Sequence, residues 1–128
     1  MVIFPGNREG SMIVSAMLAL ALQDWTPPAP ETLNFNEAYG CSVLSQVTRD
    51  NYFSGGTTPQ TTGEQAIWDR LTKLHELAEV QVARAQADEQ LTDEVRVGVE
   101  NGVRSQFGDQ TDEILVQILD RCAMVFGV

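Results

Sequence analysis

The longest unbroken helical pattern in the chain runs from residue 62 to residue 87. Its apolar residues recur at steps of three and four, which places them on one stripe of a helix: Ile67, Leu71, Leu74, Ala78, Val82 and Ala85. Thr61 with Glu64, or Thr62 with Gln65, has the spacing of a capping box and predicts where this helix begins. Because a helix with one apolar stripe needs other elements to cover that stripe, the pattern predicts a helical bundle.

Three further segments carry helical patterns. The first is predicted over residues 35–52, after Asn34 as a capping residue, and it carries apolar residues on two sides. A helix that is apolar on two sides is usually covered on two sides. The other two are predicted after Thr92 and after Thr111, each followed directly by acidic residues that are typical of a helix start.

These patterns predict an all-α fold, an up-and-down four-helix bundle over residues 34–128. The bundle is preceded by an apolar or signal-like segment at 1–23 and by a Pro-rich linker at 24–33. Gly98 and Gly102 fall inside the third predicted helix, and we expect them to allow close approach of another helix.

The apolar run of eleven residues from 12 to 22 is too short to cross a membrane core of about 30 Å as a helix. Its length suits the apolar core of a signal peptide, and small residues at Ala19 and Ala21 predict cleavage after Ala21. The alternative is a short core helix, because Arg8 is the only basic side chain before the run and Glu9 follows it. The signal-peptide interpretation predicts a periplasmic or secreted protein; the alternative location is cytoplasmic.

The chain holds two cysteines, Cys41 in the first helix of the bundle and Cys122 in the last. The first and last helices of an up-and-down bundle are commonly neighbours, so a disulfide between them is geometrically reasonable. Closing this loop of 81 residues would stabilise the fold by about 4 to 5 kcal/mol, through the entropy lost by the unfolded chain. The alternative is two buried free thiols. An even cysteine count beside an export-like N-terminus favours the disulfide.

The formal charge of −10 repels the phosphates of nucleic acids and of anionic lipids, so we expect no nucleic-acid partner. Between positions 88 and 113, eight acidic residues oppose only two arginines. Two acidic pairs in this region form a candidate interaction surface: Asp93 with Glu94, and Asp112 with Glu113. The alternative is that they occupy the first turns of helices, where the helix dipole stabilises negative charge.

His75 is the only histidine, and Glu79 follows it one helical turn later. This spacing suits two metal ligands, but a transition-metal site needs more nitrogen or sulfur ligands than the chain offers. Packing or a surface ion pair is therefore the favoured role of His75, and a functional site at His75 and Glu79 is the weaker alternative. No phosphate-binding glycine loop, Gly-x-Ser-x-Gly turn or cysteine-centred signature occurs, so we expect no catalytic residue, metal or cofactor.

Together these observations predict a small exported helical protein that binds a partner protein and catalyses no reaction. An alternative of another class is a cytosolic acidic inhibitor or immunity protein that masks a basic enzyme, which the excess of acids favours. The identity of the partner and the oligomeric state do not follow from the sequence.

Overall fold

The computed structural model describes residues 26–54 and 57–128. This part of the chain contains four α-helices and no strand. The helices are α2 (Phe35–Tyr52), α3 (Thr62–Asp88), α4 (Asp93–Gly108) and α5 (Asp112–Phe126), with a short 3-10 turn, η1 (Pro30–Thr32), before them. The predicted all-helical fold with four helices after the Pro-rich segment is therefore confirmed. The predicted signal-like segment lies outside the described residues.

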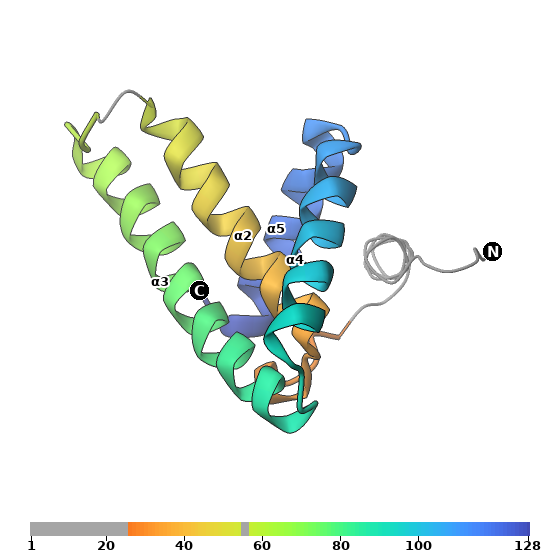
Figure 1. The fold of residues 1–128 in the computed structure, drawn as a ribbon. Helices are drawn as coiled ribbons and strands as arrows, with labels where there is room; N and C mark the ends of the chain where they lie inside the picture. Colours follow the sequence, from red (N-terminus) through yellow and green to blue (C-terminus); the bar gives the residue numbers. More distant parts are fainter. Residues whose placement is uncertain (1–25, 55–56) are drawn as a thin grey trace.

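The helices run in alternating directions along the chain, and α2 contacts each of the other three (Figure 1). The most extensive packing joins α2 and α3, which lie antiparallel. The α2–α3 pair and the α4–α5 pair converge where α3 ends and α4 begins, and they diverge toward their other ends (Figure 1). The arrangement is therefore more open than a bundle whose four helices pack along their whole length.

Each helix begins at a side chain that accepts a hydrogen bond from the first turn. Asn34 and Glu37 form a reciprocal capping box before α2. Thr61, Thr92 and Thr111 accept from backbone N–H groups of α3, α4 and α5, respectively. Such caps satisfy backbone groups that have no partner inside the helix, and each stabilises its helix by about 1 kcal/mol. At the other end of the chain, Gly127 closes α5 in the left-handed conformation.

The core lies on two sides of α2, as its two apolar stripes predict. On one side, Cys41 and Leu44 pack with Leu74 of α3 and Ile118 of α5. On the other side, an aromatic and aliphatic cluster joins α2 to α3 and α4: Phe35, Tyr39, Val43, Ala85 and Val103. Because both clusters share α2, this helix is the one around which the others are arranged.

The prediction that Gly98 and Gly102 allow close helix approach is wrong. A Cβ atom built at either glycine meets no group of the described residues within 4 Å. The close approach occurs at Gly40 of α2, where a Cβ atom would lie 3.3 Å from Cζ of Phe107 in α4. The missing side chain at Gly40 is therefore what lets α4 cross α2.

The end of the Pro-rich segment, at Glu31 and Leu33, lies against α3. Leu33 is 5% exposed, and the buried Gln81 of α3 donates from Nε2 to the carbonyl oxygens of Leu33 (2.9 Å) and Glu31 (3.3 Å). These bonds satisfy backbone acceptors that have no helical partner. Within the described ranges, no helix is long and apolar enough to cross a membrane.

Candidate functional site

A cleft of ≈ 520 Å³ lies between α2, α3 and α4. Its volume is within the range of about 300 to 1,000 Å³ that is typical of small-molecule sites. Polar and charged side chains from three helices line it. Those that carry its chemistry are Tyr39, Ser42, His75, Glu79, Arg96, Glu100 and Arg104.

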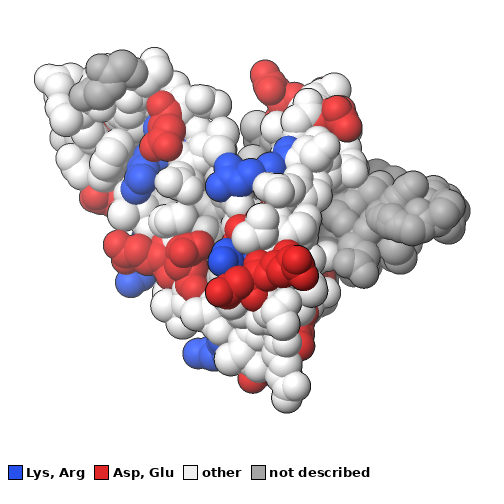
Figure 2. All heavy atoms as spheres, viewed as in Figure 1, with Lys and Arg blue, Asp and Glu red and all other residues white. Residues whose placement is uncertain are grey.

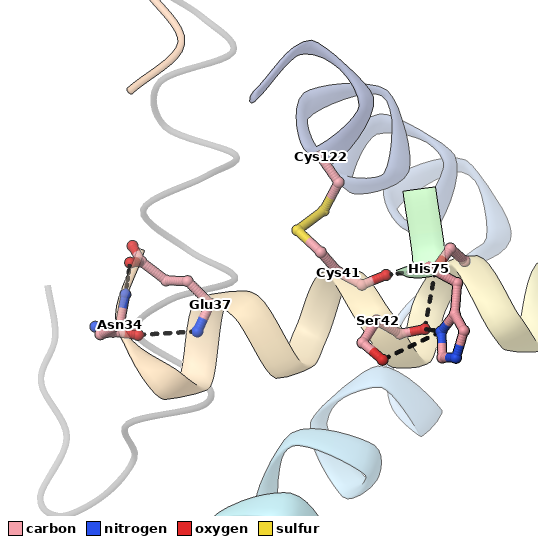
Figure 3. Close-up of a disulfide and its surroundings, with 7 residues drawn as sticks. Asn34, Glu37, Cys41, Ser42, His75 and Cys122 are labelled. Carbon is pink, nitrogen blue, oxygen red and sulfur yellow. Dashed lines mark hydrogen bonds between the residues drawn. A yellow bond between two sulfur atoms is a disulfide. The ribbon is translucent and has the colours of Figure 1, made fainter. Parts of the chain in front are cut away.

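On the α3 wall, His75 and Glu79 both contact Ser42 of α2. The Ser42 hydroxyl donates to Oε2 of Glu79 and lies 3.2 Å from Nδ1 of His75. Nδ1 also lies 3.0 Å from the backbone oxygen of Ser42, which can only accept, so this hydrogen bond requires the proton on Nδ1 (Figure 3). The second ring nitrogen, Nε2, is then an acceptor when the imidazole is neutral.

This serine, histidine and carboxylate do not have the connectivity of a nucleophilic triad. In a triad the histidine lies between the serine and the acid, accepting from one and donating to the other. In this protein Ser42 lies between His75 and Glu79, and it is 2% exposed. A hydroxyl in this position orients its neighbours and has little access to a substrate.

On the α4 wall, Arg104 is held by Tyr39 of α2. Nε of Arg104 donates to the Tyr39 hydroxyl over 2.8 Å, and its guanidinium carbon lies 5.7 Å from the centre of the Tyr39 ring. Burial raises the pKa of Tyr39 above its ordinary value of 10.0, against the lowering effect of Arg104. The tyrosine is therefore a neutral hydrogen-bonding group at physiological pH.

A second arginine on α4 is already paired. Nη1 of Arg96 donates to Oε2 of Glu100 over 2.8 Å, and Nε lies 3.9 Å from Asp93. The side chains of Arg96 and Glu100 are 29% and 22% exposed, so this pair is partly shielded from solvent. Figure 2 shows acidic atoms over α3 and over α4 with basic atoms between them, so the surface around the cleft carries both signs of charge.

Of the residues singled out in the sequence, His75 and Glu79 come together in this cleft. They do so through Ser42, which was not predicted to belong to a site. Among the described residues, no group of three or more histidine, cysteine, aspartate or glutamate side chains is placed to hold a metal ion.

The two acidic pairs are not brought together. Asp93 and Glu94 lie in the first turn of α4, and Asp112 and Glu113 lie in the first turn of α5. The sixteen residues of α4 span about 24 Å. Because α4 and α5 run in opposite directions, the two pairs lie toward opposite ends of these helices (Figure 1).

Cys41 and Cys122 lie outside the cleft, in the core between α2 and α5. Their Cα atoms are 5.6 Å apart and their sulfur atoms are joined as a disulfide, with both residues at most 1% exposed (Figure 3). The bond links the first and last helices of the described chain across 81 positions.

The residues that α2 and α4 contribute to the cleft were not predicted from the sequence. Tyr39 and Ser42 are three positions apart on α2, a spacing that places two side chains on one face. Arg96, Glu100 and Arg104 follow at steps of four on α4. Both polar stripes can be seen in the sequence. Whether the stripe on α2 faces the stripe on α4 depends on how the two helices cross.

A second hollow of ≈ 180 Å³ lies between α2, α3 and α5, lined mainly by aliphatic side chains such as Leu71, Leu74 and Leu119. It is smaller, and its lining has two charged residues, Arg70 and Asp120, against four in the first cleft, which is therefore the better candidate site. No protein-family model, no curated protein and no solved structure matches this chain. What the protein does must therefore be inferred from the cleft and its residues.

Proposed function

We propose that this is a small exported helical protein that binds a ligand in the cleft between α2, α3 and α4 and does not change it chemically. The observation that carries the proposal is the pre-ordering of charged groups around the cleft. Tyr39 orients Arg104 from one side, and Ser42 orients Glu79 from the other. Groups that are already held in place lose little conformational entropy on binding, which favours affinity.

Binding is favoured over catalysis by the environment of the candidate nucleophile. Ser42 is buried and its hydroxyl is engaged by Glu79. Nucleophilic catalysis requires a group that can reach its substrate and a base that accepts its proton. In the cleft, His75 instead directs its Nδ1 toward the backbone of Ser42.

Export is supported by the signal-like N-terminal sequence and by the Cys41–Cys122 bond. Disulfides persist in oxidising compartments such as the periplasm and the extracellular space, and they are rare in the cytosol. The periplasm or the cell exterior is therefore the proposed location, with the cytoplasm as the alternative.

An acidic inhibitor or immunity protein that masks a basic enzyme remains the alternative function. It is favoured by the formal charge of −10 and by the acids between positions 88 and 113. Charge reversal at Asp93, Glu94, Asp112 and Glu113 would weaken such a complex and reduce its salt dependence. A captured partner whose affinity is unchanged by these substitutions would count against this alternative.

The test of the binding function compares two tryptophan variants. Ala83 is an exposed residue of α3 that lines the cleft, so Ala83→Trp should fill part of it. Ala87→Trp adds the same side chain one turn later, outside the lining, and serves as the matched control.

We expect a low-molecular-mass extract fraction to raise the melting temperature of the wild-type protein and of Ala87→Trp, but not of Ala83→Trp. A ligand at a hundred times its Kd stabilises the folded state by about 2.7 kcal/mol, which is readily measured. The proposal fails if no fraction stabilises the wild-type protein, or if Ala83→Trp responds as strongly as its control.

A further inference from the structure

The cleft differs in charge from the rest of the protein. The chain has a formal charge of −10, yet the acidic and basic residues that line the cleft, histidine aside, are two glutamates and two arginines. One arginine and one glutamate, Arg96 and Glu100, neutralise each other over 2.8 Å. The other two, Arg104 and Glu79, decide which charges a ligand should carry.

Arg104 on the α4 wall is a cation without a carboxylate partner among the described residues, since none lies within 4.0 Å of it. Its Nε is used by the Tyr39 hydroxyl, which fixes the plane of the guanidinium. The terminal nitrogens of a guanidinium carry four further N–H donors, arranged to grip a carboxylate. This end of the cleft suits an anionic group.

Glu79 on the α3 wall is an acidic residue without a lysine or arginine partner among the described residues. No lysine or arginine of the described chain lies within 4.0 Å of its carboxylate, and Oε2 accepts from Ser42. An ionised carboxylate has acceptor capacity beyond this one bond. This side of the cleft suits a cationic group such as an ammonium.

The two unpaired charges are oriented by one helix and kept apart by the cleft. Tyr39, which holds Arg104, and Ser42, which holds Glu79, are three positions apart on α2. Arg104 and Glu79 belong to opposite walls, α4 and α3, and are not within ion-pairing distance. A ligand that carried both charges could neutralise both walls at once.

We infer that the cleft binds a small zwitterion, a short peptide whose terminal carboxylate meets Arg104 and whose terminal ammonium meets Glu79. A ligand with only negative charge would face Glu79 and the field of the whole acidic protein. A ligand with only positive charge would leave Arg104 unmatched. This inference rests on the proposed binding function and names the ligand class of the same site.

The probe is trialanine, titrated calorimetrically into the intact oxidised protein beside N-acetyl-trialanine and trialanine amide. Each blocked peptide lacks one terminal charge and has nearly the same size. We expect each block to weaken binding about tenfold or more, as loss of a hydrogen bond to a charged group does.

Two variants test which cleft residue binds which terminus of the peptide. Glu79→Gln should remove the preference for a free ammonium and keep the preference for a free carboxylate, and Arg104→Gln should do the reverse. Glu76→Gln and Arg70→Gln change exposed residues of α3 outside the cleft lining and should leave both preferences unchanged.

Equal binding of the three peptides, or preferences that survive both cleft variants, would overturn the inference. If trialanine does not bind while an extract fraction still stabilises the wild-type protein and not Ala83→Trp, the binding function stands and the zwitterion assignment is wrong. If neither binds, both are wrong.

Discussion

Adding one methyl group at Gly40 should have the opposite effect from adding it at Gly102. Both glycines lie inside helices, where alanine is favoured over glycine by about 1 kcal/mol. At Gly102 the new Cβ meets no described residue within 4 Å, so Gly102→Ala should stabilise the protein by about 0.5 to 1 kcal/mol. At Gly40 the new Cβ lies 3.3 Å from Cζ of Phe107, closer than ordinary van der Waals contact.

Crowding of this kind in a packed core costs about 1 to 3 kcal/mol. The net effect of Gly40→Ala is therefore a loss of about 0 to 2 kcal/mol. The difference between the two variants isolates the crowding, because the helix-propensity gain is common to both. Urea unfolding followed by far-UV circular dichroism measures each free energy, provided that the denaturant slope is unchanged.

Shortening the opposing side chain provides the internal control. Phe107→Leu removes the ring edge that the new methyl group would meet, so Gly40→Ala should become favourable in that background. The close approach of α4 to α2 would be refuted if Gly40→Ala stabilised the wild-type protein as much as Gly102→Ala does.

Three further perturbations test other parts of the structure. Reduction of the Cys41–Cys122 bond, which closes a loop of 81 positions, should lower the free energy of unfolding by about 4 to 5 kcal/mol, and a Cys41→Ala, Cys122→Ala variant should not respond to reductant in urea titrations. Gln81→Leu removes the donor to the carbonyl oxygens of Leu33 and Glu31. It should lower the free energy of unfolding by about 1 to 3 kcal/mol and speed amide hydrogen exchange over residues 31–35. Unchanged exchange would contradict the role of Gln81. Because burial raises the pKa of Tyr39, the folded state favours the neutral phenol. The stability that this gives is fully present below pH 10.0 and should be lost as the pH rises through the higher pKa of the folded state. In a pH titration followed by tyrosinate absorbance, the component that is absent in Tyr39→Phe should titrate above 10.0.

The helices could be predicted from the sequence because their signals are local. Asn34, Thr61, Thr92 and Thr111 each precede a helix that the structure contains, and Gly127 ends the last one. Capping depends on residues within one turn of each other, so no tertiary information is needed to detect it. The two apolar sides of α2 were equally visible, because periodicity alone reveals them.

The helix crossings and the cleft could not be predicted in this way. Gly40, Gly98 and Gly102 look alike in sequence, yet of the three only Gly40 lies close to another of the described helices. Which glycine lies at a crossing depends on the angle and position of the crossing, and these are set by packing. The same holds for Arg104 and Tyr39, which are 65 positions apart and meet only because α4 crosses α2.

The decisive measurement is the redox state of the two cysteines in protein from its native source, because the link between α2 and α5 and the proposed oxidising compartment both depend on it. The measurement is intact mass after alkylation under denaturing conditions, with and without prior reduction. We expect no label before reduction, two labels after it, and a mass that lacks residues 1–21. Two labels without reduction would show free thiols and contradict both the bond and the proposed export.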